Sequence, residues 1–141
     1  MQHKPNILIF CHDLVSVRII TDAAERYFDL RWVRDARQWC SSLSAENPPA
    51  AALLDNAAAT VAAIPMLQAV QKSLPAVKRI LLSDYCDLAL IVQGIHTGAV
   101  QQIVYKPIHP SDLLSSLGAT GAAQTSQAAN LRSTASLRAV G

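Results

Sequence analysis

The sequence predicts an α/β protein built on a doubly wound parallel sheet of five strands, a (βα)5 arrangement with helices on both faces. Two features lead to this class of fold. Short apolar runs alternate along the chain with segments whose apolar residues recur at helical spacing. The links between these elements are short, and this alternation with short links favours parallel strands that are covered on both sides.

Five apolar runs have the length and composition of buried strands. They are residues 6–10, 30–33, 50–54, 79–82 and 103–105. The first and the third are almost wholly aliphatic, without the alternation of a half-exposed strand, which indicates burial on both faces of the sheet.

Five helices are expected to follow these strands. The first has apolar residues at 17, 20, 24 and 27–28, the second spans 35–43, the third has them at 63, 67, 70 and 74, the fourth at 88, 91–92 and 95, and the last spans 110–117. Pro75 ends the third helix, Gly98 closes the fourth, and Pro110 suits the first turn of the last one. Residues 56–60 are expected to be a loop.

The composition is that of one globular domain followed by a tail. The chain has 141 residues, of which 51% are hydrophobic and 16% charged, which is enough for one core and too little for two domains. We expect a domain over residues 1–118. The Ala-, Ser-, Gly- and Gln-rich segment 119–141 is expected to be a tail or linker, with a weak helical pattern at 131–140.

The charges argue against a nucleic-acid-binding face. Residues 1–118 contain ten basic and ten acidic side chains, so the net charge of +2 comes from Arg132 and Arg138 in the tail. No apolar stretch suits a membrane span, and the chain does not open with a secretion leader. Three cysteines without CxxC spacing fit a reducing compartment. We therefore expect a cytoplasmic protein that binds neither nucleic acid nor membrane.

Polar side chains stand where the expected strands end. Asp55, Ser83 and Lys106 follow the third, fourth and fifth strands, and the first strand runs into Cys-His-Asp at residues 11–13. In an open parallel sheet, ligands bind at the carboxyl ends of the strands. A carboxylate, a hydroxyl and an ammonium group at neighbouring ends would supply a nucleophile, a hydrogen-bond donor and a counter-charge for a phosphoryl group. We expect them to converge in one exposed pocket.

With these residues in place, the sequence resembles the receiver domains of two-component response regulators over roughly residues 6–118. The likeness is strongest in residues 79–117, RILLSDYCDLALIVQGIHTGAVQQIVYKPIHPSDLLSSL. There a strand ending in Ser, a helix, Gly-Ala, a strand, Lys-Pro and a short amphipathic helix follow one another, and Leu-Leu-Asp ends the preceding strand. The resemblance implies a flavodoxin-like fold and a role in phosphorelay signal transduction. The Asp-Tyr-x-Asp-Leu run is most similar to receivers that accompany cyclic-dinucleotide phosphodiesterase domains.

The resemblance assigns roles position by position. Asp55 matches the phosphoacceptor, which takes a phosphoryl group from a kinase histidine. Ser83 and Lys106 match the hydroxyl and the lysine that bind the phosphoryl oxygens, and the peptide bond before Pro107 is expected to be cis. The resemblance implies a signalling domain that is not an enzyme. Its partner would be a sensor histidine kinase or a phosphotransfer protein.

The chain departs from the family at the metal site, where receivers end the first strand in two acids that hold Mg²⁺ with the phosphoacceptor. Here that pair falls on Cys11 and His12 or, with one residue bulged, on His12 and Asp13, so at most one acid remains. A thiol or an imidazole is a poor substitute, because Mg²⁺ prefers carboxylates and water. Asp13 and Asp55 are the expected ligands of a weakened site, although Asp13 also suits the N-cap of the next helix.

A transition-metal site at Cys11 and His12 is disfavoured, since adjacent residues of a strand point to opposite faces. A buried thiol beside a polar histidine is the better interpretation. Three residues before Lys106, Ile103 stands where receivers carry an aromatic switch residue. We therefore expect little conformational coupling between Asp55 and the output face, residues 88–117. This face of fourth helix, fifth strand and fifth helix would bind a second copy or an output partner.

Two functions remain open. The chain is a receiver that is phosphorylated weakly or atypically, or a pseudo-receiver of the same fold that acts as an interaction or dimerisation module without phosphoryl transfer. A flavin or cobalamin carrier is excluded, because no Gly-rich loop follows the first strand and no Asp-x-His-x-x-Gly run is present.

Overall fold

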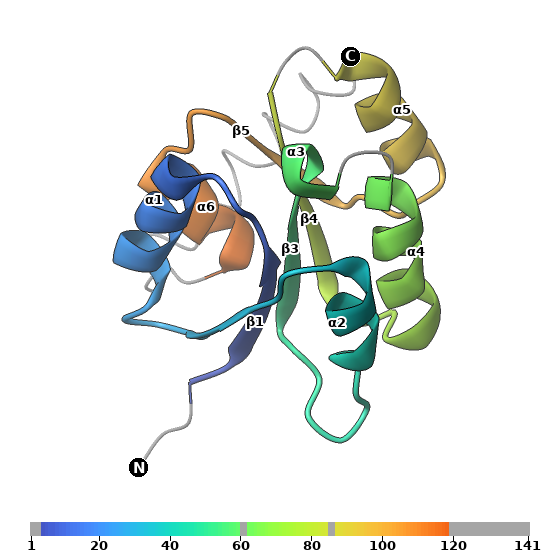
Figure 1. Cartoon of the computed structure of the whole chain (residues 1–141), viewed down its shortest axis with the longest axis horizontal. Coiled ribbons are helices and arrows are strands. Elements are labelled where there is room, and N and C mark those ends of the chain that lie inside the picture. Colours follow the sequence, from blue (N-terminus) through green and yellow to red (C-terminus); the bar gives the residue numbers. More distant parts are fainter. Residues whose placement is uncertain (1–3, 60–61, 85–86, 119–141) are drawn as a thin grey trace.

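The computed structural model describes residues 4–59, 62–84 and 87–118, and it confirms the predicted α/β class. In these residues, five strands form one parallel sheet in the order β2-β1-β3-β4-β5. Figure 1 shows this sheet between two layers of helices. The strands are β1 (Asn6–Phe10), β2 (Asp29–Trp32), β3 (Ala51–Asp55), β4 (Lys78–Ser83) and β5 (Gln102–Tyr105).

The described residues also form six helices. α1 and α6 cover one face of the sheet, α2, α4 and α5 cover the other, and α3 lies at the end of β3 (Figure 1). Their bounds are α1 (Leu14–Ala24), α2 (Ala36–Ser41), α3 (Asn56–Ala59), α4 (Ala63–Ser73), α5 (Leu88–His96) and α6 (Pro110–Leu117).

The core has two halves, one on each face of the sheet, as expected for strands that are buried on both sides. All five residues of β3 are buried, and its successive side chains join opposite halves. Leu53 belongs to the half under α1 and α6 with Ile9, whereas Leu54 belongs to the half under α2 and α4 with Leu8. Burial of each such side chain contributes about 1.5–3 kcal/mol, so a slip of register would be costly on both faces.

Two helices begin at an aspartate whose side chain caps the helix. Asp13 accepts hydrogen bonds from the backbone N–H groups of Val15 and Ser16 at the start of α1. Asp35 accepts one from the backbone N–H of Gln38 at the start of α2. Both aspartates have an extended backbone, the usual conformation of an N-cap residue.

α1 is shorter than the apolar spacing predicts. It ends at Ala24, and the backbone N–H groups of Tyr27 and Phe28 both donate to the Ala24 carbonyl at 3.0 Å. This turn buries Phe28 in the core and starts β2 at Asp29. The apolar spacing through residues 27–28 therefore extends past the helix into a turn, where Phe28 is buried and Tyr27 is exposed.

The expected loop after Asp55 also differs, since residues 56–59 form the short helix α3. Its three alanines favour helix, and Asp55 Oδ1 accepts a hydrogen bond from the backbone N–H of Ala57 in the first turn. The expected tail, residues 119–141, lies outside the described residues. Among the helices of the described part, none is long and apolar enough to cross a membrane.

Candidate functional site

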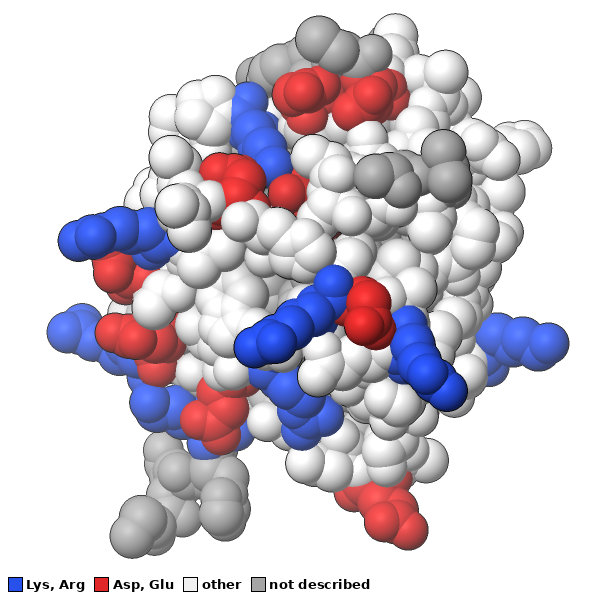
Figure 2. Space-filling model, viewed as in Figure 1, with Lys and Arg blue, Asp and Glu red and all other residues white. Residues whose placement is uncertain are grey.

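The residues singled out from the sequence lie at the carboxyl ends of the strands. Asp55 ends β3, Ser83 ends β4, and Lys106 follows the last residue of β5. Because β4 lies between β3 and β5, Lys106 reaches across the end of β4 to contact Asp55. In Figure 2, side chains of both charges gather in the upper part of this face, at the end of the sheet where α3 lies in Figure 1.

Asp55 is enclosed by its neighbours, with only 1% of the residue exposed. Its Oδ2 accepts hydrogen bonds from the Lys106 ammonium at 2.8 Å and from the Cys11 thiol at 3.5 Å. Its Oδ1 accepts the backbone hydrogen bond from Ala57 at 3.1 Å. The expectation that the three site residues share an exposed pocket is therefore wrong for Asp55, whose side chain is covered by the groups that bind it, and for Ser83, which is also buried.

Lys106 joins two carboxylates. Its Nζ lies 2.8 Å from Asp55 Oδ2 and 3.1 Å from Asp13 Oδ2. Partial burial by itself lowers the pKa of this ammonium, but the hydrogen bonds and charges of Asp55 and Asp13 outweigh burial and raise the pKa. The ammonium therefore stays charged and reduces the repulsion between the two carboxylates. The peptide bond from Lys106 to Pro107 is cis.

Asp13 is the N-cap of α1, one of the two roles that the sequence leaves as alternatives, and it also contacts Lys106. Its Oδ1 caps α1, while its Oδ2 accepts hydrogen bonds from the Ser16 hydroxyl and from Lys106. The hydrogen bonds from Ser16, and after them the interactions with Lys106, lower the pKa of Asp13 to about 2. Asp13 is thus a capping residue and an ionised wall of the site at once.

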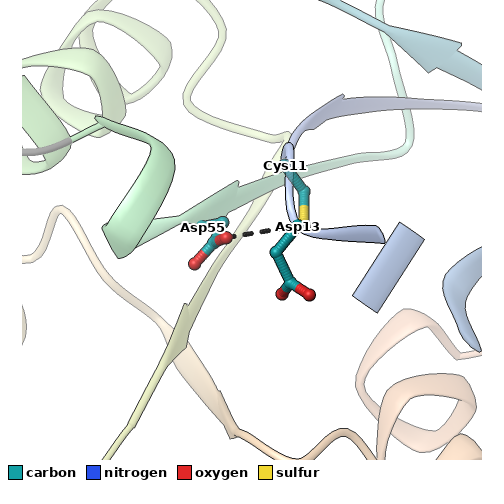
Figure 3. Close-up of side chains that lie close together, drawn as sticks. All are labelled: Cys11, Asp13 and Asp55. Carbon is teal, nitrogen blue, oxygen red and sulfur yellow. Dashed lines mark hydrogen bonds between the residues drawn. The ribbon is translucent and has the colours of Figure 1, made fainter. Parts of the chain in front are cut away.

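Cys11 faces Asp55 from the end of β1. Burial first, and the Asp55 charge second, raise the pKa of the thiol to about 12. The thiol therefore keeps its proton and donates a hydrogen bond to Asp55 Oδ2 (Figure 3). His12 is exposed, and its ring meets Phe10 edge-on at a centroid distance of 4.7 Å. The side chains of residues 11 and 13 lie in the site, whereas the pairs expected from the sequence are residues 11–12 or 12–13. Alternate residues of an extended chain lie on the same side, which explains the difference.

Cys11, Asp13 and Asp55 form a cluster with the spacing of metal ligands in the described part of the chain. One donor atom of each lies within 4.8 Å of the others, and Figure 3 shows the three side chains together. The two carboxylates fit a hard cation such as Mg²⁺, whereas a protonated thiol does not. The donor set fits Mg²⁺ with two ligands instead of three, and the ion would compete with the Lys106 ammonium.

Ser83 takes part in a separate network at the end of β4. Its hydroxyl donates to the Asp84 carbonyl at 3.0 Å and lies 3.5 Å from Asp87 Oδ2. The same Asp87 oxygen accepts a 2.7 Å hydrogen bond from the side-chain amide of Asn56. The structure thus brings Asp55 and Lys106 together, while Ser83 shares a carboxylate with Asn56.

Ile103 is half-buried on β5 and packs against the core half that contains Ile91 of α5 and Val100. On the outer side of α5, Leu88 and Val92 are 64% and 57% exposed. The expected output face therefore has no aromatic ring at the switch position and presents large apolar side chains.

Asp87 and Asn56 are not predicted as site residues from the sequence. Asn56 directly follows Asp55, and Asp87 stands four residues after Ser83, immediately before a helix. An aspartate in that place is typical of an N-cap, so the sequence pattern points toward α5 and away from the site.

No protein-family model matches the chain, and no curated protein sequence does. Solved structures are similar to it. The signal receiver domain of an HD domain-containing protein from Pseudomonas fluorescens Pf-5 has a TM-score of 0.70 and 22% identity, covering 98% of this chain and 96% of that one. A CheY-like receiver domain protein from Methanospirillum hungatei JF-1 has a TM-score of 0.69 and 22% identity, covering 82% and 91%.

A further similar structure carries the name adenylate cyclase, from Rhodopirellula baltica, with a TM-score of 0.72, 16% identity and coverage of 95% and 96%. The five-stranded parallel sheet with helices on both faces defines a flavodoxin-like α/β protein, and the acid–lysine pair lies at the carboxyl end of this sheet. Within this class, the chain has the fold of response-regulator receiver domains, as most of the similar structures do. At 14–22% identity the likeness shows the fold alone, so the name adenylate cyclase assigns no activity to this chain.

Proposed function

We propose that this chain is a response-regulator receiver domain that accepts a phosphoryl group on Asp55 from the phosphohistidine of a sensor kinase or phosphotransfer protein. One observation carries the proposal: the Lys106 ammonium lies 2.8 Å from Asp55 Oδ2 at the carboxyl end of a sheet with the receiver fold. A cation fixed at this point lowers the repulsion between the acceptor and an incoming phosphoryl group. It then pairs with the phosphoryl oxygens.

In the transfer, a carboxylate oxygen of Asp55 supplies the electron pair of the new O–P bond. The N–P bond of the phosphohistidine breaks, and the released imidazole nitrogen takes up a proton from solvent. Most of the catalytic effect in phosphoryl transfer comes from position and charge. Lys106 supplies the charge, and the Ser83 hydroxyl supplies a donor for a phosphoryl oxygen once it leaves the carbonyl of Asp84. We assign the domain the role of acceptor and not that of an enzyme.

Asp13 and Asp55 would hold Mg²⁺, which supplies positive charge to the phosphoryl oxygens when it is bound. The neutral Cys11 thiol leaves the cluster one carboxylate short of the family pattern, so we propose weak Mg²⁺ affinity and therefore weak or atypical phosphorylation. A low-affinity site would saturate only above millimolar Mg²⁺.

A second candidate is the pseudo-receiver, a module of the same fold that binds a partner or a second copy without phosphoryl transfer. The exposed Leu88 and Val92 of α5 favour it, because neighbouring apolar side chains on a helix suit a protein contact. In either case we propose a domain over residues 1–118 and a tail or linker over residues 119–141. A cytoplasmic location is in line with the free cysteines Cys11 and Cys40.

The test uses the full chain with acetyl phosphate as a small phosphodonor, and beryllofluoride as a phosphoryl mimic, at increasing Mg²⁺. We expect intact mass to show one added phosphoryl group in the wild type and none in Asp55→Asn. Asp112→Asn, which changes an exposed acid on α6, serves as the control and should be labelled like the wild type. The acceptor role would be overturned in favour of the pseudo-receiver by a wild type that takes up neither the phosphoryl group nor beryllofluoride. Its partner binding and self-association would then be the same with and without these reagents.

A further inference from the structure

Apart from the four-residue α3, three described helices, α1, α2 and α5, begin after an aspartate, and one of these three aspartates does not cap its helix. Asp13 and Asp35 have extended backbones with ψ of 129° and 172°, and their carboxylates accept first-turn amides. Asp87 has φ −97° and ψ 40°, and its side chain makes no capping hydrogen bond. Its carbonyl nevertheless accepts the hydrogen bond from Ile91 N–H at 3.0 Å that starts the helix. Asp87 thus stands at the N-cap with its carboxylate turned elsewhere.

The candidate site holds that carboxylate. Asp87 Oδ2 accepts the 2.7 Å hydrogen bond from Asn56 Nδ2 and lies 3.5 Å from the Ser83 hydroxyl. Asn56 is buried, and its Oδ1 has no hydrogen-bond partner among the described residues, so the amide is anchored through its nitrogen. The Asn56 amide is therefore occupied by an internal anion, which also lies beside the Ser83 hydroxyl while that hydroxyl donates to the Asp84 carbonyl.

We propose that Asp87 is a positioning residue with two stable positions, which couple the state of Asp55 to the start of α5. Without a phosphoryl group on Asp55, the carboxylate lies against Asn56 and Ser83, as in the structure. With a phosphoryl group there, it caps the first turn of α5. This inference rests on the proposed role of Asp55 as the phosphoryl acceptor.

Electrostatics and hydrogen bonding drive the exchange. A phosphoryl group adds up to about two negative charges and three acceptor oxygens beside the Asp87 carboxylate. The Ser83 hydroxyl then donates to a phosphoryl oxygen, and the like charge repels Asp87 from its present position. Once released, Asp87 adopts by a rotation of ψ the same extended backbone conformation that Asp13 and Asp35 have. Its carboxylate then accepts hydrogen bonds from the backbone N–H groups of Ala89 and Leu90.

This exchange gives Asp55 a route to the output face that does not use Ile103. The expectation of little coupling rests on the missing aromatic ring of β5, whereas Asp87 acts through the first turn of the helix that carries Leu88 and Val92. The step is a local change of charge and capping that biases one helix, which is a common form of switch.

The test separates reach from capping with two variants. Asp87→Ser keeps a capping oxygen but is too short to reach Asn56, and Asp87→Ala removes both functions. Asp112→Ala is the matched control, since Asp112 is an exposed carboxylate in the first turn of α6. The readouts are beryllofluoride bound at Asp55, followed by fluorine NMR, and amide hydrogen exchange at Ala89 and Leu90.

In the wild type, we expect bound beryllofluoride to slow exchange at Ala89 and Leu90 about five-fold, the usual effect of one N-cap. In Asp87→Ser these amides should exchange slowly with or without the mimic, and in Asp87→Ala they should exchange rapidly in both states. Both variants should bind the mimic more tightly than the wild type, because no carboxylate beside Ser83 then repels the mimic. Asp112→Ala should behave as the wild type.

The outcomes distinguish this inference from the proposed function. A wild type that binds the mimic at Asp55 without a change at Ala89 and Leu90 overturns the two-position role and leaves the acceptor role standing. Equal exchange in Asp87→Ser and Asp87→Ala overturns it as well, since capping would then have no effect. A wild type that binds no mimic at Asp55 overturns the proposed function, and the coupling with it.

Discussion

Both ends of the sheet bury a charged side chain, but they satisfy it with different partners. At the carboxyl end, the buried Asp55 is bound by other side chains, Lys106 and Cys11. At the amino end, near the start of β4, Arg79 is only 5% exposed, and its guanidinium donates to backbone carbonyls. These carbonyls belong to Ala99 at 3.1 Å, Pro75 at 3.2 Å, Val77 at 3.3 Å and Gly98 at 3.1 Å.

The difference separates a structural contact from a site that can react. Backbone carbonyls have fixed positions and do not titrate, so they hold Arg79 in one arrangement and tie the turn before β4 to the turn after α5. Burial lowers the pKa of Arg79, yet an arginine remains charged in a protein. The partners of Asp55 Oδ2, Lys106 and Cys11, are side chains that can rotate toward an incoming ligand. In this protein a buried charged side chain therefore indicates function only where its hydrogen-bond partners are side chains that can move to bind a ligand.

The largest effect is expected for Arg79→Met. Loss of the guanidinium leaves several buried carbonyls without a donor, so the free energy of unfolding should fall by about 3 kcal/mol. Urea denaturation measures this loss, and mimic binding at Asp55 in the folded variant should be unchanged. Arg37→Met, at an exposed arginine, is the control. If Arg79→Met were as stable as Arg37→Met, Arg79 would not hold the two turns together.

Lys106→Met tests the opposite end of the sheet. Asp55 keeps its burial but loses its cation, which should lower the free energy of unfolding by about 2 kcal/mol at neutral pH. Added Mg²⁺ should recover more stability in this variant than in the wild type, because the competing ammonium is absent. Thermal unfolding with and without Mg²⁺ measures both effects, with Lys72→Met at an exposed position as control. If the unfolding temperature of Lys106→Met did not change with Mg²⁺, Asp13 and Asp55 would not bind the ion.

The same contrast explains how far the sequence could predict the site. The contact between Lys106 and Asp55 follows from the order of the strands, since both residues stand at strand ends that any five-stranded sheet of this type brings together. β1 and β3 were predictable because their aliphatic runs fit only buried strands. The choice of Cys11 and Asp13 over His12, and the turn of Asp87 toward Asn56, 31 residues away in the chain, depend on backbone angles and rotamers. Nothing in the sequence pattern around Arg79 predicts that its guanidinium donates to backbone carbonyls of two turns.

Cys11→Asp restores the missing carboxylate of the cluster. A third acid beside Asp13 and Asp55 should raise Mg²⁺ affinity about tenfold, since the ion prefers carboxylate ligands. His12→Asp is the matched control, because the His12 side chain lies against Phe10 and outside the cluster. Isothermal titration with Mg²⁺ compares the two. A gain in His12→Asp that equals or exceeds the gain in Cys11→Asp would mean that residue 12 holds the acid position.

The smallest effect is expected from the charge of Asp13, and it depends on pH. The pKa of Asp13 is lowered from 3.8 to about 2 in the folded protein, so folding is favoured by its ionised form. This contribution is complete above about pH 4 and is lost as the pH falls toward about 2. Since the Asp13 side chain is 43% exposed, screening by solvent reduces it to about 1 kcal/mol. Asp13→Asn keeps a capping side chain and removes the charge. Urea denaturation across this range should therefore show a stability difference between wild type and variant at neutral pH that vanishes in acid. A difference that persists unchanged at the acid end would assign the effect to capping geometry and not to the charge of Asp13 with its partners Ser16 and Lys106.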